Sequence, residues 1–238
     1  ILSRGRLSIN SGQGSIRIEG LSKSYYAINF SVPANTSTTT GDKFLSLISS
    51  KSSGNAITIK GDSETHYGIV FNYNVPKEVL ATGGGNILIE GTAGSYYGVF
   101  VQNVDILASS GDISIKGGQR GVRAPNAGMR LGGKTGSLIE SSSSNILIQG
   151  DALVIDSPIN GLTSSISSSG GATIEPSSSS FTNSFTWPSD LILDSTLGSL
   201  TVGKSTNTSD ITLSDAITVS GRVSIYGGDI TVNESIDT

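Results

Sequence analysis

The feature that most constrains this chain is a short apolar alternation that recurs five times, each time ending at a glycine. The copies are SIRIEG (Ser15–Gly20), AITIKG (Ala56–Gly61), NILIEG (Asn86–Gly91), DISIKG (Asp112–Gly117) and NILIQG (Asn145–Gly150). Their first isoleucines, Ile16, Ile57, Ile87, Ile113 and Ile146, follow one another at intervals of 26 to 41 residues. Repeats of this length indicate stacked units, in which each copy covers the apolar face of the next.

Two further segments recur with the motif. Nine residues after each of the first three isoleucines stand YYAINF (Tyr25–Phe30), HYGIVF (His66–Phe71) and YYGVFV (Tyr96–Val101). A third apolar patch closes each unit, at 44–48, 79–80, 104–107 and 138–139. Strands of three to six residues between Gly, Asn and Ser turns predict an all-β chain, with three short strands in each coil of a parallel β-helix, or β-solenoid.

Parity then assigns the faces of the first strand, because successive side chains alternate across a sheet. The repeated isoleucines should point inward and stack from coil to coil. One outward column then reads Glu19, Lys60, Glu90 and Lys116, followed by Gln149. We expect this charge ladder to help set the register of the coils, because a slip by one coil would bring like charges together.

The chain divides into three parts. Residues 1–150 are predicted to form coils of about 26–41 residues, with insertions at Pro33–Asp42 and Tyr73–Lys77. Residues 151–188 form either an irregular Ser-rich coil or an insertion. Residues 189–238 show short apolar alternations that predict a continued solenoid with coils of about 19 residues. The strand pattern persists to the last residues, so we expect a longer parent chain or another molecule to cover this end.

Composition excludes several classes of function. The net charge is −4 and no Lys/Arg cluster is present, which argues against a nucleic-acid partner. The absence of cysteine excludes disulfides and thiolate chemistry. No apolar run approaches the roughly 20 residues of a membrane span. We therefore predict no cofactor, no metal site and no membrane span.

Candidate catalytic groups do not form a recognisable set. His66 is the only histidine, and it occupies the column of Tyr25 and Tyr96, where a planar side chain in a stack explains it. A β-helix polysaccharide lyase or hydrolase needs acids that converge on one face. The acids are scattered along the chain, at Asp62, Glu64, Asp105, Asp112, Asp151 and Asp156. The sequence predicts that the protein is not an enzyme.

The aromatic positions could serve as a contact stripe. Tyr25, His66 and Tyr96 point outward if Ile28, Ile69 and Val99 point inward, and Phe100 completes the stripe. The rings either form a ladder that stabilises neighbouring coils or make a surface that contacts a glycan or another chain.

Two phrases carry a resemblance to a known group. GGGNILIEGTAGSYYGVFV (Gly83–Val101) and AITVSGRVSIYGGDITVNESI (Ala216–Ile236) resemble the repeats of large bacterial exoproteins, the filamentous-haemagglutinin-like and autotransporter-type adhesins. The resemblance implies a right-handed parallel β-helix located outside the cell or on the bacterial cell surface. It also implies a role in adhesion, surface coating or filament and biofilm formation.

The sequence therefore predicts an extracellular structural or adhesive rod that acts by surface presentation and self-association. Its expected partners are further copies of itself, end to end or side by side, or glycans of a host or cell surface. The alternatives are a polysaccharide-binding or polysaccharide-cleaving β-helix enzyme and a fragment of a phage tail shaft.

Overall fold

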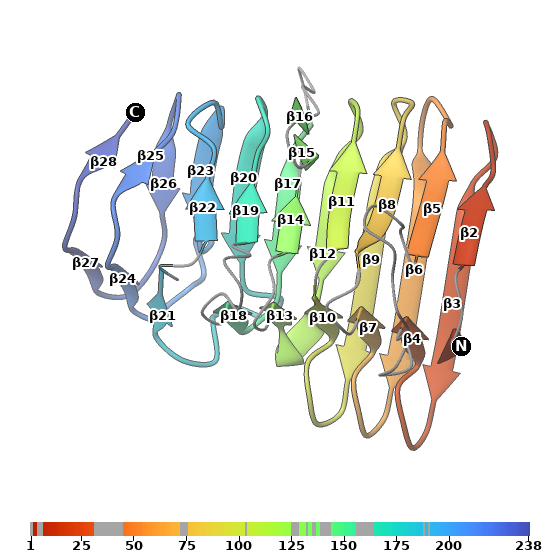
Figure 1. Ribbon diagram of the computed structural model, residues 1–238. Helices are drawn as coiled ribbons and strands as arrows, with labels where there is room; N and C mark the ends of the chain where they lie inside the picture. The colour runs from red at the N-terminus through yellow and green to blue at the C-terminus, as the bar shows by residue number, and fades with distance from the viewer. Residues whose placement is uncertain are drawn as a thin grey trace.

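The computed structural model describes residues 2–3, 7–30, 45–71, 76–102, 104–124, 129–131, 133–134, 137–138, 144–155, 164–187, 189 and 191–238. This part of the chain is all-β, and its main sheets are parallel (Figure 1). Its only helical element is a short 3-10 turn, η1 (Gly118–Arg120). None of the described segments forms a helix with the length and apolarity needed to cross a bilayer. The predicted all-β class is confirmed.

The longest sheet, sheet C, contains the five motif copies and continues beyond them. Its strands, in spatial order, are β3 (Ile16–Ser22), β6 (Asn55–Ser63), β9 (Asn86–Ala93), β12 (Ile113–Lys116), β17 (Ile146–Gln149), β20 (Gly171–Glu175), β23 (Ser199–Val202) and β26 (Val223–Ile225). Each strand pairs in parallel with the next, so motif copies far apart in sequence lie side by side.

Two further parallel sheets collect the other segments of each repeat. Sheet A contains β1 (Leu2–Ser3), β4 (Ile28–Phe30), β7 (Ile69–Phe71), β10 (Val99–Val101), β13 (Val122–Ala124) and β18 (Leu153–Ile155). Sheet B contains β2 (Leu7–Asn10), β5 (Leu45–Ser49), β8 (Lys77–Ala81), β11 (Val104–Ala108), β14 (Met129–Leu131), β19 (Ser164–Ile166) and β22 (Leu191–Leu193). From β3 to β14 the chain visits sheets C, A and B in strict rotation, an order compatible with a β-solenoid.

The third sheet differs from the prediction in one repeat. We predicted its strand near residues 138–139, but β14 (Met129–Leu131) is the strand that pairs with β11. Leu138 lies instead in β16 (Ser137–Leu138), which pairs antiparallel with β15 (Gly133–Lys134) in a small sheet D. The prediction relied on apolar residues alone, and Met129-Arg130-Leu131 offers only two of them around a charge. Ile139 and the predicted insertion at residues 33–42 lie outside the described residues.

In the C-terminal part sheet C continues, but two new sheets, E and F, follow where sheets A and B end. Sheet E contains β21 (Phe185–Thr186), β24 (Ile211–Leu213) and β27 (Ile230–Val232), and sheet F contains β25 (Ile217–Thr218) and β28 (Ile236–Asp237). Within the Ser-rich stretch 151–188, strands β18, β19 and β20 pair with strands of the preceding repeat. In Figure 1 the successive repeats follow one another in one row, from the N-terminus at the right to the C-terminus at the left.

Stacked aliphatic columns form the core. Ile57, Ile87, Ile113 and Ile146 follow Ile16 in register, and all five side chains are buried, as predicted. Ala172, Leu200 and Val223 extend the same column to β26. Full burial of one such aliphatic side chain contributes roughly 1.5–3 kcal/mol, and the sum over a column fixes the register.

Aromatic side chains fill the core where the isoleucine pattern weakens. Phe181, Phe185 and Trp187 are each at most 5% exposed. The rings of Phe181 and Phe185 stack with centroids 5.0 Å apart, and Trp187 meets Phe185 edge-on at 6.4 Å. These large rings supply the apolar volume that the surrounding serines do not.

Candidate functional site

The outward face of β3, β6, β9 and β12 carries the charged column. Glu19, Lys60, Glu90 and Lys116 are paired in direct register, one on each strand. The Lys60 ammonium lies 2.6 Å from a Glu90 carboxylate oxygen, and both side chains are about two-fifths exposed, 40% and 39%. The Glu19 carboxylate instead pairs with Arg17 on its own strand at 2.5 Å. The column therefore alternates in sign, and one of its neighbouring pairs forms a close ion pair.

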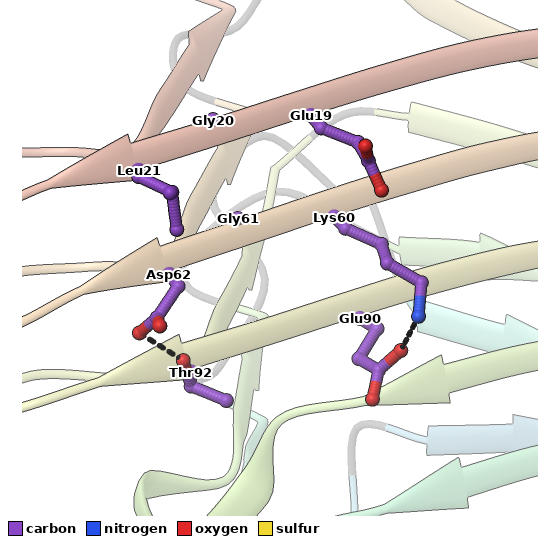
Figure 2. A pocket seen from close by; sticks show the side chains of 8 residues that line it. All are labelled: Glu19, Gly20, Leu21, Lys60, Gly61, Asp62, Glu90 and Thr92. Carbon is purple, nitrogen blue, oxygen red and sulfur yellow. Dashed lines mark hydrogen bonds and ion pairs between the residues drawn. The ribbon is translucent and has the colours of Figure 1, made fainter.

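An open groove of about 420 Å³ lies beside this column, across three neighbouring strands (Figure 2). Its lining comprises Glu19, Gly20, Leu21, Lys60, Gly61, Asp62, Glu90 and Thr92. Gly20, Gly61 and Gly91 stand in one register column directly after the charged residues. A Cβ on any of the three would overlap a carbonyl oxygen of the segment leading into the next strand, that of Ala27, Gly68 or Gly98. The glycine that ends each motif therefore allows the chain to pass close by at this corner.

Four polar side chains of the groove pair with one another. Thr92 donates a hydrogen bond from Oγ1 to the Asp62 carboxylate, and Lys60 pairs with Glu90, as the dashed lines in Figure 2 mark. Leu21 occupies the Asp62 column one strand away, and its side chain is 86% exposed. The face thus offers flat, mixed-charge contacts with one projecting apolar side chain.

Serine side chains hold the turns that leave this face. After β3, Ser22 accepts a hydrogen bond from the Tyr25 backbone N–H at 3.0 Å. After β6, Ser63 accepts one from the His66 N–H at 2.9 Å and donates to the Tyr25 carbonyl oxygen at 2.6 Å. Ser63 therefore links two successive repeats and fixes the position of the ring pair that follows.

Seven rings gather after these turns and form what we call the aromatic corner. Its members are Tyr25, Tyr26, His66, Tyr67, Tyr96, Tyr97 and Phe100. His66 lies between Tyr25 and Tyr96, at centroid distances of 5.1 and 4.4 Å. Tyr67 connects the inner rings and meets Phe100 edge-on at 5.3 Å. The two end members, Tyr25 and Tyr96, remain about half exposed, at 56% and 49%.

Electrostatics at the aromatic corner favour neutral rings. Burial lowers the pKa of the His66 imidazole. Burial also raises the pKa of Tyr67, and the nearby Arg123 guanidinium opposes this rise. Arg123 itself lies 5.4 Å from the centre of the Tyr97 ring, within range of a cation–π contact. Among the described atoms, His66 Nδ1 is buried and has no hydrogen-bond partner. The imidazole stacks on the Tyr96 ring, with 23° between the two planes, and meets the Tyr25 ring edge-on, at 68°.

Lys77 was predicted as the last residue of the insertion Tyr73–Lys77, but the structure places it in β8 as a buried residue. Lys77 occupies an inward column of sheet B between Leu45 and Val104, and it is 1% exposed. Its ammonium donates to the Gln102 carbonyl oxygen at 3.0 Å, and burial lowers its pKa to about 7. Parity contained the signal, because Lys77 stands two residues before the inward Val79.

A ladder of Asn and Asp side chains runs across the N-terminal ends of the sheet C strands. Asn86 accepts a hydrogen bond from the Asp112 N–H at 2.9 Å, and Asp112 accepts one from the Asn145 N–H at 2.8 Å. Asn145 accepts from the Gly171 N–H at 3.2 Å. The sequence contained a signal for this ladder, because Asn86, Asp112 and Asn145 each stand directly before the first isoleucine of a motif copy.

The other acids that the structure describes lie on different elements of the fold. Asp105 lies on sheet B, Asp151 is buried and accepts a hydrogen bond from the Ser178 N–H, and Asp156 lies outside the described residues. Within the described ranges, no group of three or more His, Asp or Glu side chains is placed to hold a metal ion.

Comparisons of the chain with protein-family models, with curated proteins and with solved structures gave no match.

Proposed function

We propose that this chain is a right-handed parallel β-helix that acts as an extracellular structural or adhesive rod of a bacterial surface protein or filament. The observation that carries the proposal is the unbroken parallel register of sheet C from β3 to β26. Such a register turns each outward position into a row of side chains with a spacing of about 4.8 Å. A stack of this kind is suited to presenting extended surfaces.

The chemistry of the groove supports contact rather than catalysis. Lys60 and Glu90 neutralise each other, and Asp62 accepts a hydrogen bond from Thr92. A glycosidase pair instead needs one carboxyl group that holds a proton and a second that stays ionised across the scissile bond. The half-exposed Tyr25 and Tyr96 provide flat apolar area beside a polar face, a combination typical of contact surfaces.

Electron microscopy combined with an adhesion assay tests this proposal. The eight strands of sheet C should give a rod segment about 35 Å long, judged from the spacing of parallel strands. Immobilised protein should retain bacterial or host cells, and Tyr25→Ala with Tyr96→Ala should lower retention at least about threefold. Tyr226→Ala is the matched control, because Tyr226 is also exposed, at 41%, but lies far along the chain from the aromatic corner. Equal retention by the native chain, the double variant and Tyr226→Ala would show that the aromatic corner does not bind cells. Globular particles in the micrographs would contradict the rod.

Polysaccharide cleavage is the second candidate, because Glu19, Asp62 and Glu90 line one open groove. Digestion of mixed polysaccharides by the native chain, and its loss in Glu90→Gln or Asp62→Asn with an unchanged melting temperature, would establish this activity. Products formed equally by these variants would assign the cleavage to a contaminant.

A further inference from the structure

We propose that the outward face of sheet C binds a second copy of this chain in antiparallel orientation. In this pair the strands of the two copies are stacked in opposite order, about a two-fold axis that passes between β6 and β9. The inference rests on the proposed function, in which the chain acts through its extended surfaces. It adds the partner, the face and the polarity of the contact.

The order of charges on the face selects the polarity. Glu19, Lys60, Glu90 and Lys116 occupy four consecutive strands in direct register. A parallel copy aligned strand for strand would set each charge against its own kind. A copy reversed about the midpoint between β6 and β9 sets Glu19 against the partner's Lys116 and Lys60 against the partner's Glu90. Four alternating charges read the same after reversal and exchange of sign, so only a reversed copy sets all four charges of this face against opposite charges.

The neighbouring outward column fits the same operation. Asp62 and Thr92 exchange places under the reversal, so the acceptor of one copy faces the hydroxyl of the other. Leu21, which is 86% exposed, would face the end of β12 in the other copy. The short turn η1 begins there, at Gly118. Gly118 stands there beside Thr92, and a Cβ at Gly118 would meet no atom closer than 3.8 Å. The projecting leucine of one copy would therefore enter the space above a glycine of the other.

The size of the face sets the strength of the contact. Four strands at about 4.8 Å spacing and about seven residues at about 3.3 Å rise cover roughly 400 Å² on each copy. This is about half the area per partner of a standard interface, so the contact belongs to the weak class. We expect a Kd weaker than about 1 µM, because interfaces about twice as large range from µM to pM.

Sedimentation velocity of charge-reversed variants tests the proposal. Lys60→Glu alone places two glutamates against two glutamates in the antiparallel pair, and Glu90→Lys alone places two lysines against two lysines. Each variant should self-associate at least about 10-fold more weakly than the native chain at about 50 mM NaCl, and about 500 mM NaCl should weaken the native association similarly. An equimolar mixture of the two variants should associate at least as well as the native chain, because every facing pair then carries opposite charges.

The mixture separates this contact from effects within one chain. Each variant has lost its internal Lys60–Glu90 ion pair, and mixing does not restore it. Arg222→Glu, in the turn between β25 and β26, is the control variant and should leave association unchanged, because Arg222 lies outside the four-strand face. No association of the native chain at low salt, or no recovery in the mixture, would overturn the proposal. Either result leaves rod formation and cell adhesion to be measured independently, so failure of this interface is distinguishable from failure of the proposed function.

Discussion

The ammonium of Lys77 donates a 3.0 Å hydrogen bond to the carbonyl oxygen of Gln102, from inside a column that it shares with Leu45 and Val104. The side chain is 1% exposed, and burial lowers its pKa from 10.5 to about 7. The unfolded chain therefore holds this proton up to about pH 10.5, whereas the folded chain releases it near pH 7. Between these values the unfolded state binds more protons, so stability contributed by this site rises with pH.

We predict that the native chain gains stability relative to Lys77→Met between pH 7 and pH 10, by up to about 1.4 kcal/mol per pH unit. At pH 7 or below, Lys77→Met should be the more stable protein by roughly 1–3 kcal/mol, because it removes the cost of burying a cation. Urea unfolding followed by circular dichroism at several pH values measures both free energies. Parallel curves for the two proteins would show that Lys77 is solvated in the folded state.

Asn207 connects three successive segments from a buried position. Its Nδ2 donates to the Tyr226 carbonyl oxygen at 2.8 Å and to that of Ser209 at 3.2 Å, and its Oδ1 accepts from the Phe181 N–H at 3.2 Å. Asn207→Ala removes these three hydrogen bonds, and we predict a loss of about 2–4 kcal/mol in the free energy of unfolding. Asn233→Ala, at an exposed position, should change it by less than about 0.5 kcal/mol. Equal effects in urea titrations of the two variants would contradict the connecting role of Asn207.

The isoleucine columns could be predicted because each repeat places the same residue type at the same inward position. Parity was enough to place Ile16, Ile57 and Ile87 in one stack, and the structure confirms it. Sheet B was harder to predict, because its inward column contains Lys77 and the buried Ser164 between apolar residues. A prediction based on hydrophobicity alone misses a strand that has a polar residue at an inward position. Backbone pairing and the neighbouring coils can stabilise such a strand nevertheless.

The aromatic corner could be predicted only in outline. The equal offsets of Tyr25, His66 and Tyr96 after the motif indicate a column of rings. The connection through Tyr67 to Phe100 depends on how the chain turns after β9, and no local sequence pattern encodes that turn. The same limit applies to the groove, whose shape depends on a glycine column and on hydrogen bonds between strands.

The glycine that ends each motif should tolerate no side chain. A Cβ at Gly91 would overlap the carbonyl oxygen of Gly98, a backbone atom that cannot move without shifting β10. We predict that Gly91→Ala lowers the free energy of unfolding by more than about 3 kcal/mol or prevents folding. Gly118→Ala is the matched control, because Gly118 has a φ of +58° and a Cβ there would meet no atom closer than 3.8 Å. It should cost only about 1 kcal/mol, from backbone conformation alone. Similar melting temperatures for the two variants would contradict the close approach at Gly91.

The Asn/Asp ladder predicts a graded response at Asp112. The Asp112 carboxylate accepts hydrogen bonds from the Asn145 backbone N–H at 2.8 Å and from its side-chain amide at 3.3 Å. Asp112→Asn keeps one acceptor oxygen for the backbone N–H, so its free energy of unfolding should lie within about 0.5 kcal/mol of the native value. Asp112→Ala removes the acceptor and should cost about 0.5–1.5 kcal/mol. Asp229→Ala supplies the comparison, because Asp229 is exposed and its side chain accepts no hydrogen bond from the described residues. If Asp112→Asn and Asp112→Ala lose the same stability in urea titrations, the charge of Asp112 matters rather than its place in the ladder.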